Sequence, residues 1–383
     1  MVKTLFVFGT RPEAIKLCPV ILHLRSRPDE FDVKVCITAQ HRSMLDQVLS
    51  AFGVQADHDL NLMRAGQTLS ESTSRMMGAL EPVLKLENPD LVLVQGDTTS
   101  TLCGALAAFY RRIAVGHVEA GLRTGDMSQP FPEEMNRVVA GKLSTLHFAA
   151  TEGAARNLTS EGVDRNRIWV TGNSGIDAVL YVRDRLAAGR LPHQDWTGRD
   201  SSRKLIVVTA HRRESFGPGL ESICRALKRL SERGDVDIVY PVHRNPNVLD
   251  PVHRMLGGCA NVSLIEPLDY VPFVDLMQQA YLLITDSGGV QEEGPSLGKP
   301  ILVMRDKTER PEAVEAGTVK LVGTSEDRIV AEACALLDDT SIHARMSRVH
   351  NPYGDGRASS RIADAIHSFF ELNRAPARIG ASV

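Results

Sequence analysis

The sequence has few of the features that mark a disulfide scaffold, a membrane protein or a nucleic-acid binder. Only six of its 383 residues are cysteines and none forms a C-x-x-C pair, so we expect reduced thiols and no metal site. No segment approaches the roughly 18 apolar residues that a membrane span needs. The formal net charge is only −3, which argues against broad electrostatic binding to nucleic acid. These absences predict a cytoplasmic protein with neither a membrane nor a nucleic-acid partner.

Two nucleotide-binding fingerprints are also missing. The first strand–helix turn carries neither the G-x-G-x-x-G motif of dinucleotide-binding proteins nor a Walker A loop. We therefore expect no bound cofactor. Any anionic ligand must be held by local Arg and Lys side chains and by helix N-termini, because the chain as a whole is slightly acidic.

Short β-branched runs alternate with helical spacing along the chain, which predicts an α/β fold of parallel sheets covered by helices on both faces. A chain of 383 residues is too long for one ordinary core, so we expect two domains, 1–172 and 173–357. The polar stretch 186–203 is expected to be an exposed loop near their junction. The predicted strands are Lys3–Phe8, Val33–Thr38, Leu91–Gln95, Ile113–Val118, Leu146–Ala150, Ile168–Val170, Leu205–Thr209, Ile238–Pro241, Val262–Ile265, Leu282–Thr285 and Ile301–Met304.

Polar residues follow many of these strands. In open parallel sheets ligands bind outside the carboxyl ends of the strands, so these residues are the candidates for a site. The segment GTRPEAIK at 9–16 is one of them: Gly9 permits a tight turn, and the helix start offers N–H groups to an anion. Arg11 and Lys16 add positive charge. A plain strand–helix turn with solvated charges is the simpler interpretation.

A second candidate anion site follows the strand that ends at Thr285. Ser287, Gly288 and Gly289 are small enough for a phosphate to approach the backbone at a helix start. One turn later, either Glu292 or Glu293 could accept hydrogen bonds from ribose hydroxyls. The simpler interpretation is a glycine turn before an acidic helix start, which the helix dipole favours by itself.

Carboxylates form a third group. Asp97 and Glu119 each follow an apolar strand, where a lone carboxylate is costly to bury. Glu133 and Glu134 fall in the first turn of a helix that Pro132 starts, and there they could simply stabilise the helix end. Carboxylates that lie near one another raise each other's pKa, as acid–base catalysis needs.

Cationic side chains form the last group. His211 follows a strand and precedes two arginines, which favours a position facing phosphate, although a lone histidine is more often structural. Arg310 is a further candidate phosphate ligand. Its alternative is a surface ion pair at a helix start, which is worth little energetically.

Together these segments resemble the non-hydrolysing UDP-N-acetylglucosamine 2-epimerases. The resemblance covers nearly the whole chain. It is carried in order by GTRPEAIK at 9–16, TAQHR at 38–42, QGDTTST at 95–101, GHVEAGLRTGD at 116–126, PFPEEMNR at 130–137, HRRESFG at 211–217, YPVHRNPNV at 240–248, TDSGGVQEEGPSLGKP at 285–300 and MRDKTERPEAVEAGT at 304–318.

The resemblance implies the GT-B fold of two-domain glycosyltransferases, with two Rossmann-like doubly wound domains that face a deep cleft. A C-terminal helix, about 358–373 here, would pack back on the first domain. Asp97, Glu119 and Glu133 match the catalytic carboxylates, and His211 matches the catalytic histidine. The positions that match substrate-binding residues are Arg11, Lys16, Arg137, His243, Phe273, Ser287, Gly288, Gly289, Glu293 and Arg310.

Members of this family are typically homodimers, and some are activated by their own substrate at a second site. Gln40 and His243 match the pattern of that regulatory site, so Gln40 is a candidate regulatory residue. The chain departs from the pattern at Ser43 and Gly66, where the activated members have Gln and Arg. Strict activation of that kind is therefore not expected.

The implied reaction inverts carbon 2 of UDP-N-acetylglucosamine and gives UDP-N-acetylmannosamine for cell-surface polysaccharide. The proton on carbon 2 has no adjacent carbonyl, so it becomes acidic only as UDP leaves carbon 1. Carboxylates then serve as base and acid, and cations stabilise the leaving diphosphate. Three alternatives remain open: a hydrolysing epimerase that releases N-acetylmannosamine and UDP, a glycosyltransferase that uses a UDP-sugar donor, and a catalytically silent UDP-sugar sensor.

Overall fold

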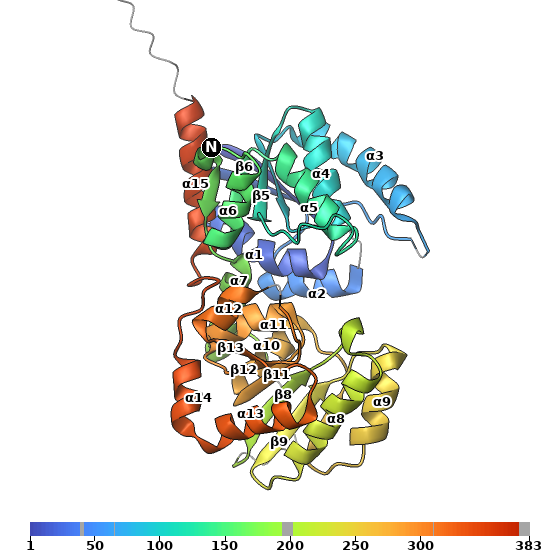
Figure 1. Cartoon of the computed structure of the whole chain (residues 1–383). Coiled ribbons are helices and arrows are strands. Elements are labelled where there is room, and N and C mark those ends of the chain that lie inside the picture. Colours follow the sequence, from blue (N-terminus) through green and yellow to red (C-terminus); the bar gives the residue numbers. More distant parts are fainter. Residues whose placement is uncertain (39–41, 65, 194–201, 309, 375–383) are drawn as a thin grey trace, which may run out of the picture. The chain divides into compact units, whose positions relative to one another are not determined.

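The computed structural model describes residues 1–38, 42–64, 66–193, 202–308 and 310–374. The chain divides into two compact units (Figure 1). The first unit comprises residues 1–178 together with the chain from residue 354 onward, and the second comprises residues 179–353. Each unit is built around one sheet in which the described neighbouring strands are parallel.

The first unit has a seven-stranded sheet of order β3-β2-β1-β4-β5-β6-β7. The order reverses between β1 and β4, which is the doubly wound arrangement with its switch point at those two strands. The strands are β1 (Val2–Phe8), β2 (Phe31–Ile37), β3 (His58–Asp59), β4 (Leu91–Gln95), β5 (Ala114–Ala120), β6 (Leu146–Ala149) and β7 (Ile168–Val170). The helices are α1 (Arg11–Arg25), α2 (Arg42–Phe52), α3 (Leu69–Glu87), α4 (Thr99–Tyr110), α5 (Glu133–Leu143), α6 (Glu152–Ser160), α7 (Ser174–Ala187, which enters the second unit) and α15 (Ala358–Arg374).

The second unit repeats the same order in six strands, β10-β9-β8-β11-β12-β13, with its switch point between β8 and β11. The strands are β8 (Lys204–Thr209), β9 (Val236–Pro241), β10 (Val262–Ile265), β11 (Leu282–Thr285), β12 (Ile301–Val303) and β13 (Val319–Leu321). The helices are α8 (Pro218–Ser231), α9 (Pro246–Leu256), α10 (Tyr270–Gln279), α11 (Gly288–Glu293), α12 (Pro311–Ala316), α13 (Glu326–Asp338) and α14 (Thr340–Ser347).

The predicted α/β class and all eleven predicted strands are confirmed, with ends that differ by up to two residues. The central strands read as continuous apolar runs because helices cover both faces, and every residue of β4 is buried. The sequence prediction missed β3 and β13, which have two and three residues at sheet edges. β3 is the polar pair His58–Asp59, and β13 has Lys320 between its two apolar residues, so neither shows an apolar run.

Helix α15 packs on the first unit, where it contacts α1. Its first N–H groups are capped by Asp177, which accepts hydrogen bonds from Ala358 at 3.1 Å and from Ser359 at 2.8 Å. An ion pair of 2.6 Å between Arg27 and Asp364 ties the middle of the helix to the first unit. These contacts explain why a segment so late in the sequence belongs to the first unit.

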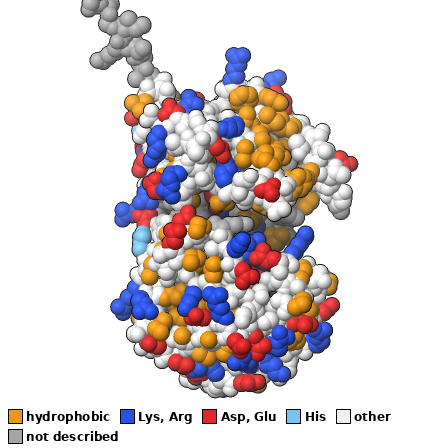
Figure 2. Space-filling view, in the orientation of Figure 1, with side chains coloured by type: hydrophobic (Ala, Val, Ile, Leu, Met, Phe, Trp, Pro, Cys, Tyr) orange, Lys and Arg blue, Asp and Glu red, His pale blue; other side chains and the backbone are white. Residues whose placement is uncertain are grey.

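The surface shown in Figure 2 mixes acidic and basic side chains on both units, in keeping with the small net charge. Of the cysteines, Cys18, Cys36, Cys103 and Cys224 are free and buried. Burial raises the pKa of the Cys103 thiol to about 11, so it is protonated at neutral pH. Among the described residues, no helix is both long and apolar enough to cross a membrane.

Candidate functional site

The first unit collects charged side chains at the switch point of its sheet. Lys16 in α1 places its Nζ 2.5 Å from Oε1 of Glu119 in β5. Arg137 in α5 places its Nε 3.6 Å from Oδ2 of Asp97, which follows β4. The fold therefore brings together four residues that the sequence predicted for one site, although they are spread over 121 positions of the chain. We call Lys16, Asp97, Glu119, Glu133 and Arg137 the first-unit group.

Glu119 lies inside β5 rather than just after a strand as predicted. The register with β6 shifts between Val118 and Ala120, and Glu119 has a φ of 64°. A non-glycine residue in this left-handed region costs roughly 1–2 kcal/mol, and such residues concentrate at functional sites. The bulge turns the carboxylate toward Lys16, while Gln95 donates a hydrogen bond from Nε2 to its Oε2. Both oxygens of Glu119 thus have partners.

Asp97 in this group has a displaced pKa. Burial raises its pKa to about 6, and the negative charges of Glu119 and Glu133 act in the same direction. The positive charges of Arg137 and Lys16 oppose the rise. A carboxyl group that titrates near pH 6 can exchange a proton at neutral pH far more readily than an ordinary aspartate.

The two neighbouring glutamates at the start of α5 have different surroundings. Glu134 is buried, and its Oε1 accepts hydrogen bonds of 3.0 Å from the backbone N–H groups of Thr124 and Gly125. Its Oε2 lies 3.0 Å from Nε of Arg137. Glu133 is half-buried, and its charge acts on Asp97. The local geometry thus engages both side-chain oxygens of Glu134 within the first unit, whereas the charge of Glu133 acts on Asp97.

The predicted anion site at the start of α1 is wrong in part, because a side chain of the protein already takes that place. Oε2 of the buried Glu13 accepts hydrogen bonds from the N–H groups of Gly9 at 3.0 Å and Thr10 at 2.7 Å. Its Oε1 accepts a bond of 2.7 Å from the Thr98 hydroxyl. Gly9 is required by close approach, not by a tight turn: a Cβ there would lie 1.9 Å from Oγ1 of Thr38.

In the second unit, the switch point is organised by Asp286, which follows β11 and is fully buried. Its Oδ2 accepts hydrogen bonds of 2.7 Å from the backbone N–H groups of His211 and Arg212. Its Oδ1 lies 3.2 Å from Nδ1 of His211. Burial alone would raise the pKa of Asp286, but the contact with His211 and the two backbone donors bring it below the usual value. The Asp286 carboxylate therefore fixes both the 211–212 backbone and the ring of His211. The His211 ring also stacks on the ring of His243, with 5.7 Å between the ring centroids.

Arg310 and Glu292 form a partly buried ion pair, with Nε of Arg310 2.7 Å from Oε1 of Glu292. The suggested ion pair of Arg310 at a helix start is therefore present, but it is partly buried rather than at the surface, and it engages Glu292. The guanidinium crosses Gly288 so closely that a Cβ at this glycine would lie 2.6 Å from Cζ of Arg310. Glycine is thus needed at this position to hold the arginine against the start of α11.

The other predicted residues of the second unit lie on neighbouring elements. Ser287 is the N-cap of α11, Phe273 lies half-buried in α10, and His243 is exposed after β9. With His211, Gly288, Gly289, Glu293 and Arg310 they form what we call the second-unit group. Gln40 falls outside the described residues. Within those residues no cluster of three or more His, Cys, Asp or Glu side chains is arranged to hold a metal ion.

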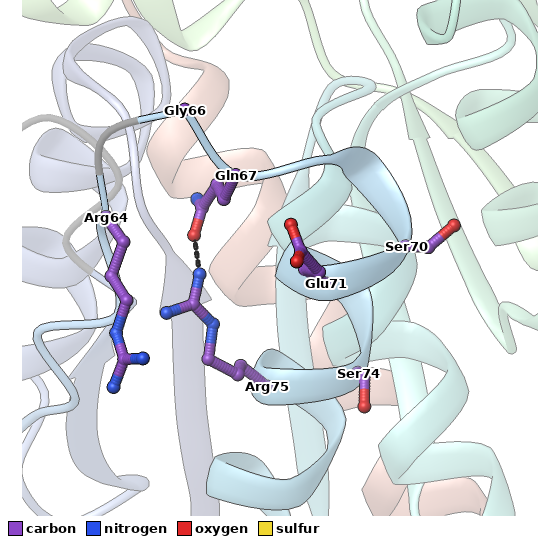
Figure 3. Close-up of a pocket in the computed structure, with 7 residues that line it drawn as sticks. All are labelled: Arg64, Gly66, Gln67, Ser70, Glu71, Ser74 and Arg75. Atoms are coloured by element: carbon purple, nitrogen blue, oxygen red, sulfur yellow. Dashed lines mark hydrogen bonds between the residues drawn. The ribbon is translucent and has the colours of Figure 1, made fainter.

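A separate pocket of about 570 Å³ lies at the start of α3 (Figure 3). It contains none of the predicted catalytic or substrate-binding residues. Gln67 points toward Arg75, whose guanidinium donates a hydrogen bond to the Gln67 side-chain oxygen. Gly66 lies on its rim with a φ of 71° and open space around its α-carbon. Gly66 is one of the two positions, with Ser43, at which the sequence departs from the pattern expected for substrate activation.

Sequence reasoning missed three polar residues that support the site: Glu13, Gln95 and Asn136. Glu13 and Gln95 contact the turns that carry Asp97 and Glu119, and Asn136 donates to the Asp97 carbonyl at 2.9 Å. All three are buried, and a buried polar side chain beside a candidate catalytic residue was the available signal.

Two doubly wound units, each with its polar residues at a switch point, define a two-domain α/β protein of the GT-B class. The same fold is seen in the glycotransferase of kitacinnamycin, at 15% identity and a TM-score of 0.62, with 96% of this chain and 98% of that chain covered. At that identity the likeness concerns the fold alone. The sequence profile of the family described as UDP-N-acetylglucosamine 2-epimerase matches residues 23–367, and the chain belongs to this family.

Individual relatives agree with the profile. The chain is 56% identical to the UDP-N-acetylglucosamine 2-epimerase of Escherichia coli (strain K12), over 95% of this chain and 98% of that protein. It is 55% identical to the enzyme of the same name from Salmonella typhimurium, over 96% and 99%. The crystal structure of UDP-GlcNAc 2-epimerase from Neisseria meningitidis bound to UDP-GlcNAc has a TM-score of 0.87 and 47% identity, with 96% of this chain and 100% of that chain covered.

Proposed function

We propose that the chain catalyses the reversible epimerisation of UDP-N-acetylglucosamine at carbon 2, giving UDP-N-acetylmannosamine without release of free sugar. Membership of the epimerase family and the Neisseria complex with UDP-GlcNAc support this substrate. The observation that carries the chemistry is the pKa of about 6 of Asp97, which is surrounded by Lys16, Glu119, Glu133 and Arg137. This is the environment that reversible proton transfer at neutral pH requires.

Elimination of UDP is the route that the residues support. Loss of UDP makes carbon 1 oxocarbenium-like and acidifies the proton on carbon 2, which a carboxylate then removes to give 2-acetamidoglucal. Return of a proton on the opposite face, followed by addition of UDP, completes the inversion. We assign these proton transfers to Asp97, Glu119 and Glu133. Lys16 contacts Glu119, and the positive charge of Arg137 opposes the rise in the pKa of Asp97.

The second-unit group is assigned to the nucleotide. His211, with its ring held by Asp286, and Arg310, held by Glu292, supply polar groups whose positions are fixed before the leaving diphosphate develops its charge. The side chain of Ser287 and the backbone N–H groups of Gly288 and Gly289 serve the same charge. Glu293 is assigned to the ribose, and His243 and Phe273 complete the nucleotide-binding set, with Phe273 near the uracil. Arg11 is assigned to the substrate from the first unit.

We also propose that the protein acts as a homodimer in the cytoplasm and that its product supplies cell-surface polysaccharide. Its free, mostly buried thiols suit a reducing compartment. Light scattering of the purified protein across a concentration series tests the dimer, because a monomer mass at micromolar concentration would contradict it.

The decisive experiment incubates the purified protein with UDP-N-acetylglucosamine in D2O, without added NAD or metal, and follows the reaction by proton NMR. The expected result is UDP-N-acetylmannosamine that carries deuterium at carbon 2. Free N-acetylmannosamine with UDP would replace the proposal by a hydrolysing epimerase. A folded, UDP-binding protein that leaves the sugar unchanged would point to a glycosyltransferase or a sensor.

A further inference from the structure

Strand β5 holds both backbone groups of Gly96, the residue before Asp97. The Gly96 N–H donates to the carbonyl of Val118 at 3.0 Å, and its own carbonyl accepts a bond of 2.7 Å from Nε2 of His117. Gly96 has a φ of 69°, a conformation that a side chain would strain. The peptide that leads into Asp97 is therefore clamped by the two residues that precede Glu119.

The ring of His117 is suited to this contact. Its side chain is only 1% exposed, and burial lowers its pKa to about 4, so the ring is neutral. Because Nε2 faces a carbonyl oxygen, the proton of the neutral ring lies on Nε2. Nδ1 has no hydrogen-bond partner among the described residues. The polar contact of the ring is thus directed at the turn that carries Asp97.

The peptide on the other side of Asp97 is held from α5. Nδ2 of Asn136 donates to the Asp97 carbonyl at 2.9 Å, and the Asn136 side chain is 2% exposed. Asn136 lies one turn after Glu133 and directly before Arg137 on the same helix. The helix that carries Glu133 therefore also fixes the backbone of Asp97.

We propose that His117 and Asn136 are positioning residues, which hold the two peptides flanking Asp97 so that its carboxylate keeps a set place relative to Glu119 and Glu133. The inference rests on the proposed epimerase function. Proton transfer to and from one carbon requires carboxylates within a few tenths of an ångström of their working positions. Without the hydrogen bonds from His117 and Asn136, the turn that carries Asp97 would lose this geometry, whereas the second-unit group would be unaffected.

The chain contains a matched control for a merely structural role. His147 in β6 is the register partner of His117, is equally buried, and has its pKa lowered by burial to about 4 as well. Its ring, however, bonds to the backbone of Ser144, which precedes its strand. Loss of either ring removes similar packing, but only His117 reaches a carboxylate-bearing turn.

The test compares His117→Leu, His117→Gln, Asn136→Ala and His147→Leu with the wild-type protein. Deuterium exchange at carbon 2 and turnover are followed by NMR, UDP binding by calorimetry, and folding by thermal denaturation. We expect kcat of His117→Leu and of Asn136→Ala to fall by about 10- to 100-fold with nearly unchanged KM and UDP affinity. His117→Gln, which keeps an N–H donor, recovers most of the loss. His147→Leu lowers the melting temperature but keeps kcat close to the wild-type value.

The possible results distinguish the positioning role from the epimerase function. Wild-type kcat in His117→Leu, or an equal loss in His147→Leu, overturns the positioning role and leaves the epimerase function standing. If His117→Leu does not fold, Asn136→Ala and His117→Gln decide by the same criteria, and unchanged kcat in the former overturns the role of Asn136. A wild-type protein that exchanges no deuterium at carbon 2 overturns both proposals.

Discussion

Nε of Arg137 lies 3.6 Å from Oδ2 of Asp97 and 3.0 Å from Oε2 of Glu134. One cation therefore serves two carboxylates of different kinds, a structural one that it helps to bury and a titratable one whose charge it favours. Because the Arg137 side chain is only 6% exposed, its charge is poorly screened by water. The protonation of Asp97 should respond to this single residue.

The pH dependence of kcat/KM is expected to have an inflection near pH 6, where Asp97 titrates. The positive charge of Arg137 lowers the pKa of Asp97, so Arg137→Met should move the inflection upward. The negative charge of Glu133 raises that pKa, so Glu133→Gln should move it downward. Profiles of residual activity in both variants check this. Shifts in the same direction, or no inflection between about pH 5 and 7, would contradict the assignment.

Glu133 and Glu134 should separate activity from stability. Glu134→Gln weakens the binding of the Thr124 and Gly125 N–H groups and leaves Arg137 without its close partner, so it should cost about 1–3 kcal/mol of stability. Glu133→Gln should leave the melting temperature nearly unchanged and reduce kcat by about 100-fold or more. Thermal denaturation and turnover are measured on both variants. If the two variants lost stability and kcat to the same extent, the assignment of a structural role to Glu134 and a catalytic role to Glu133 would be wrong.

Gly9→Ala should destabilise the first unit, because the new methyl group would lie 1.9 Å from Oγ1 of Thr38 and 2.6 Å from Oγ of Ser100. We expect a loss of about 1–3 kcal/mol, as is usual for overpacking a filled core. Gly78→Ala is the matched control: Gly78 lies in α3 with nothing within 4 Å of the added carbon, so it should gain about 0.5–1 kcal/mol. Urea denaturation measures both changes. A stable Gly9→Ala protein would refute the close approach.

Asp286→Asn should weaken the second unit in a pH-dependent way. The lowered pKa of Asp286 means that its ionised form stabilises the fold above the usual aspartate pKa, and this contribution disappears as the pH falls through the lowered value. The variant should lose about 1–3 kcal/mol near pH 7 and progressively less in acid. Denaturation at several pH values checks the trend, and a loss that grows in acid would contradict it.

Much of the architecture follows from local pattern. Apolar runs of three to six residues identified the strands, and the rule that ligands gather at strand ends placed Asp97 and His211 on candidate site turns. Both patterns, the apolar runs and the polar residues that follow them, are visible among residues that are adjacent in the sequence. The family resemblance added individual positions, such as Arg137, whose proximity to Asp97 the structure then shows.

Partnerships between distant segments could not be read in this way. The sequence does not distinguish Glu133 from Glu134, since both lie in one helical turn, and only the fold brings the 124–125 loop to the second of them. In the same way Arg310 is 18 residues from Glu292, and their pairing depends on how two loops pack around Gly288. The φ of 64° at Glu119 belongs to a β-bulge, which cannot be predicted from the amino-acid composition of the strand.

The side chain of Glu13 has a consequence for the redesign of the chain. Both units wind their strands in the same order, and in each a helix follows the first strand of the unit. In the first unit the backbone N–H groups of Gly9 and Thr10, which precede this helix, are occupied by hydrogen bonds to the Glu13 side chain. Grafting a nucleotide pocket there would require removing Glu13, which would also release Thr98, the residue directly after Asp97, from its hydrogen bond.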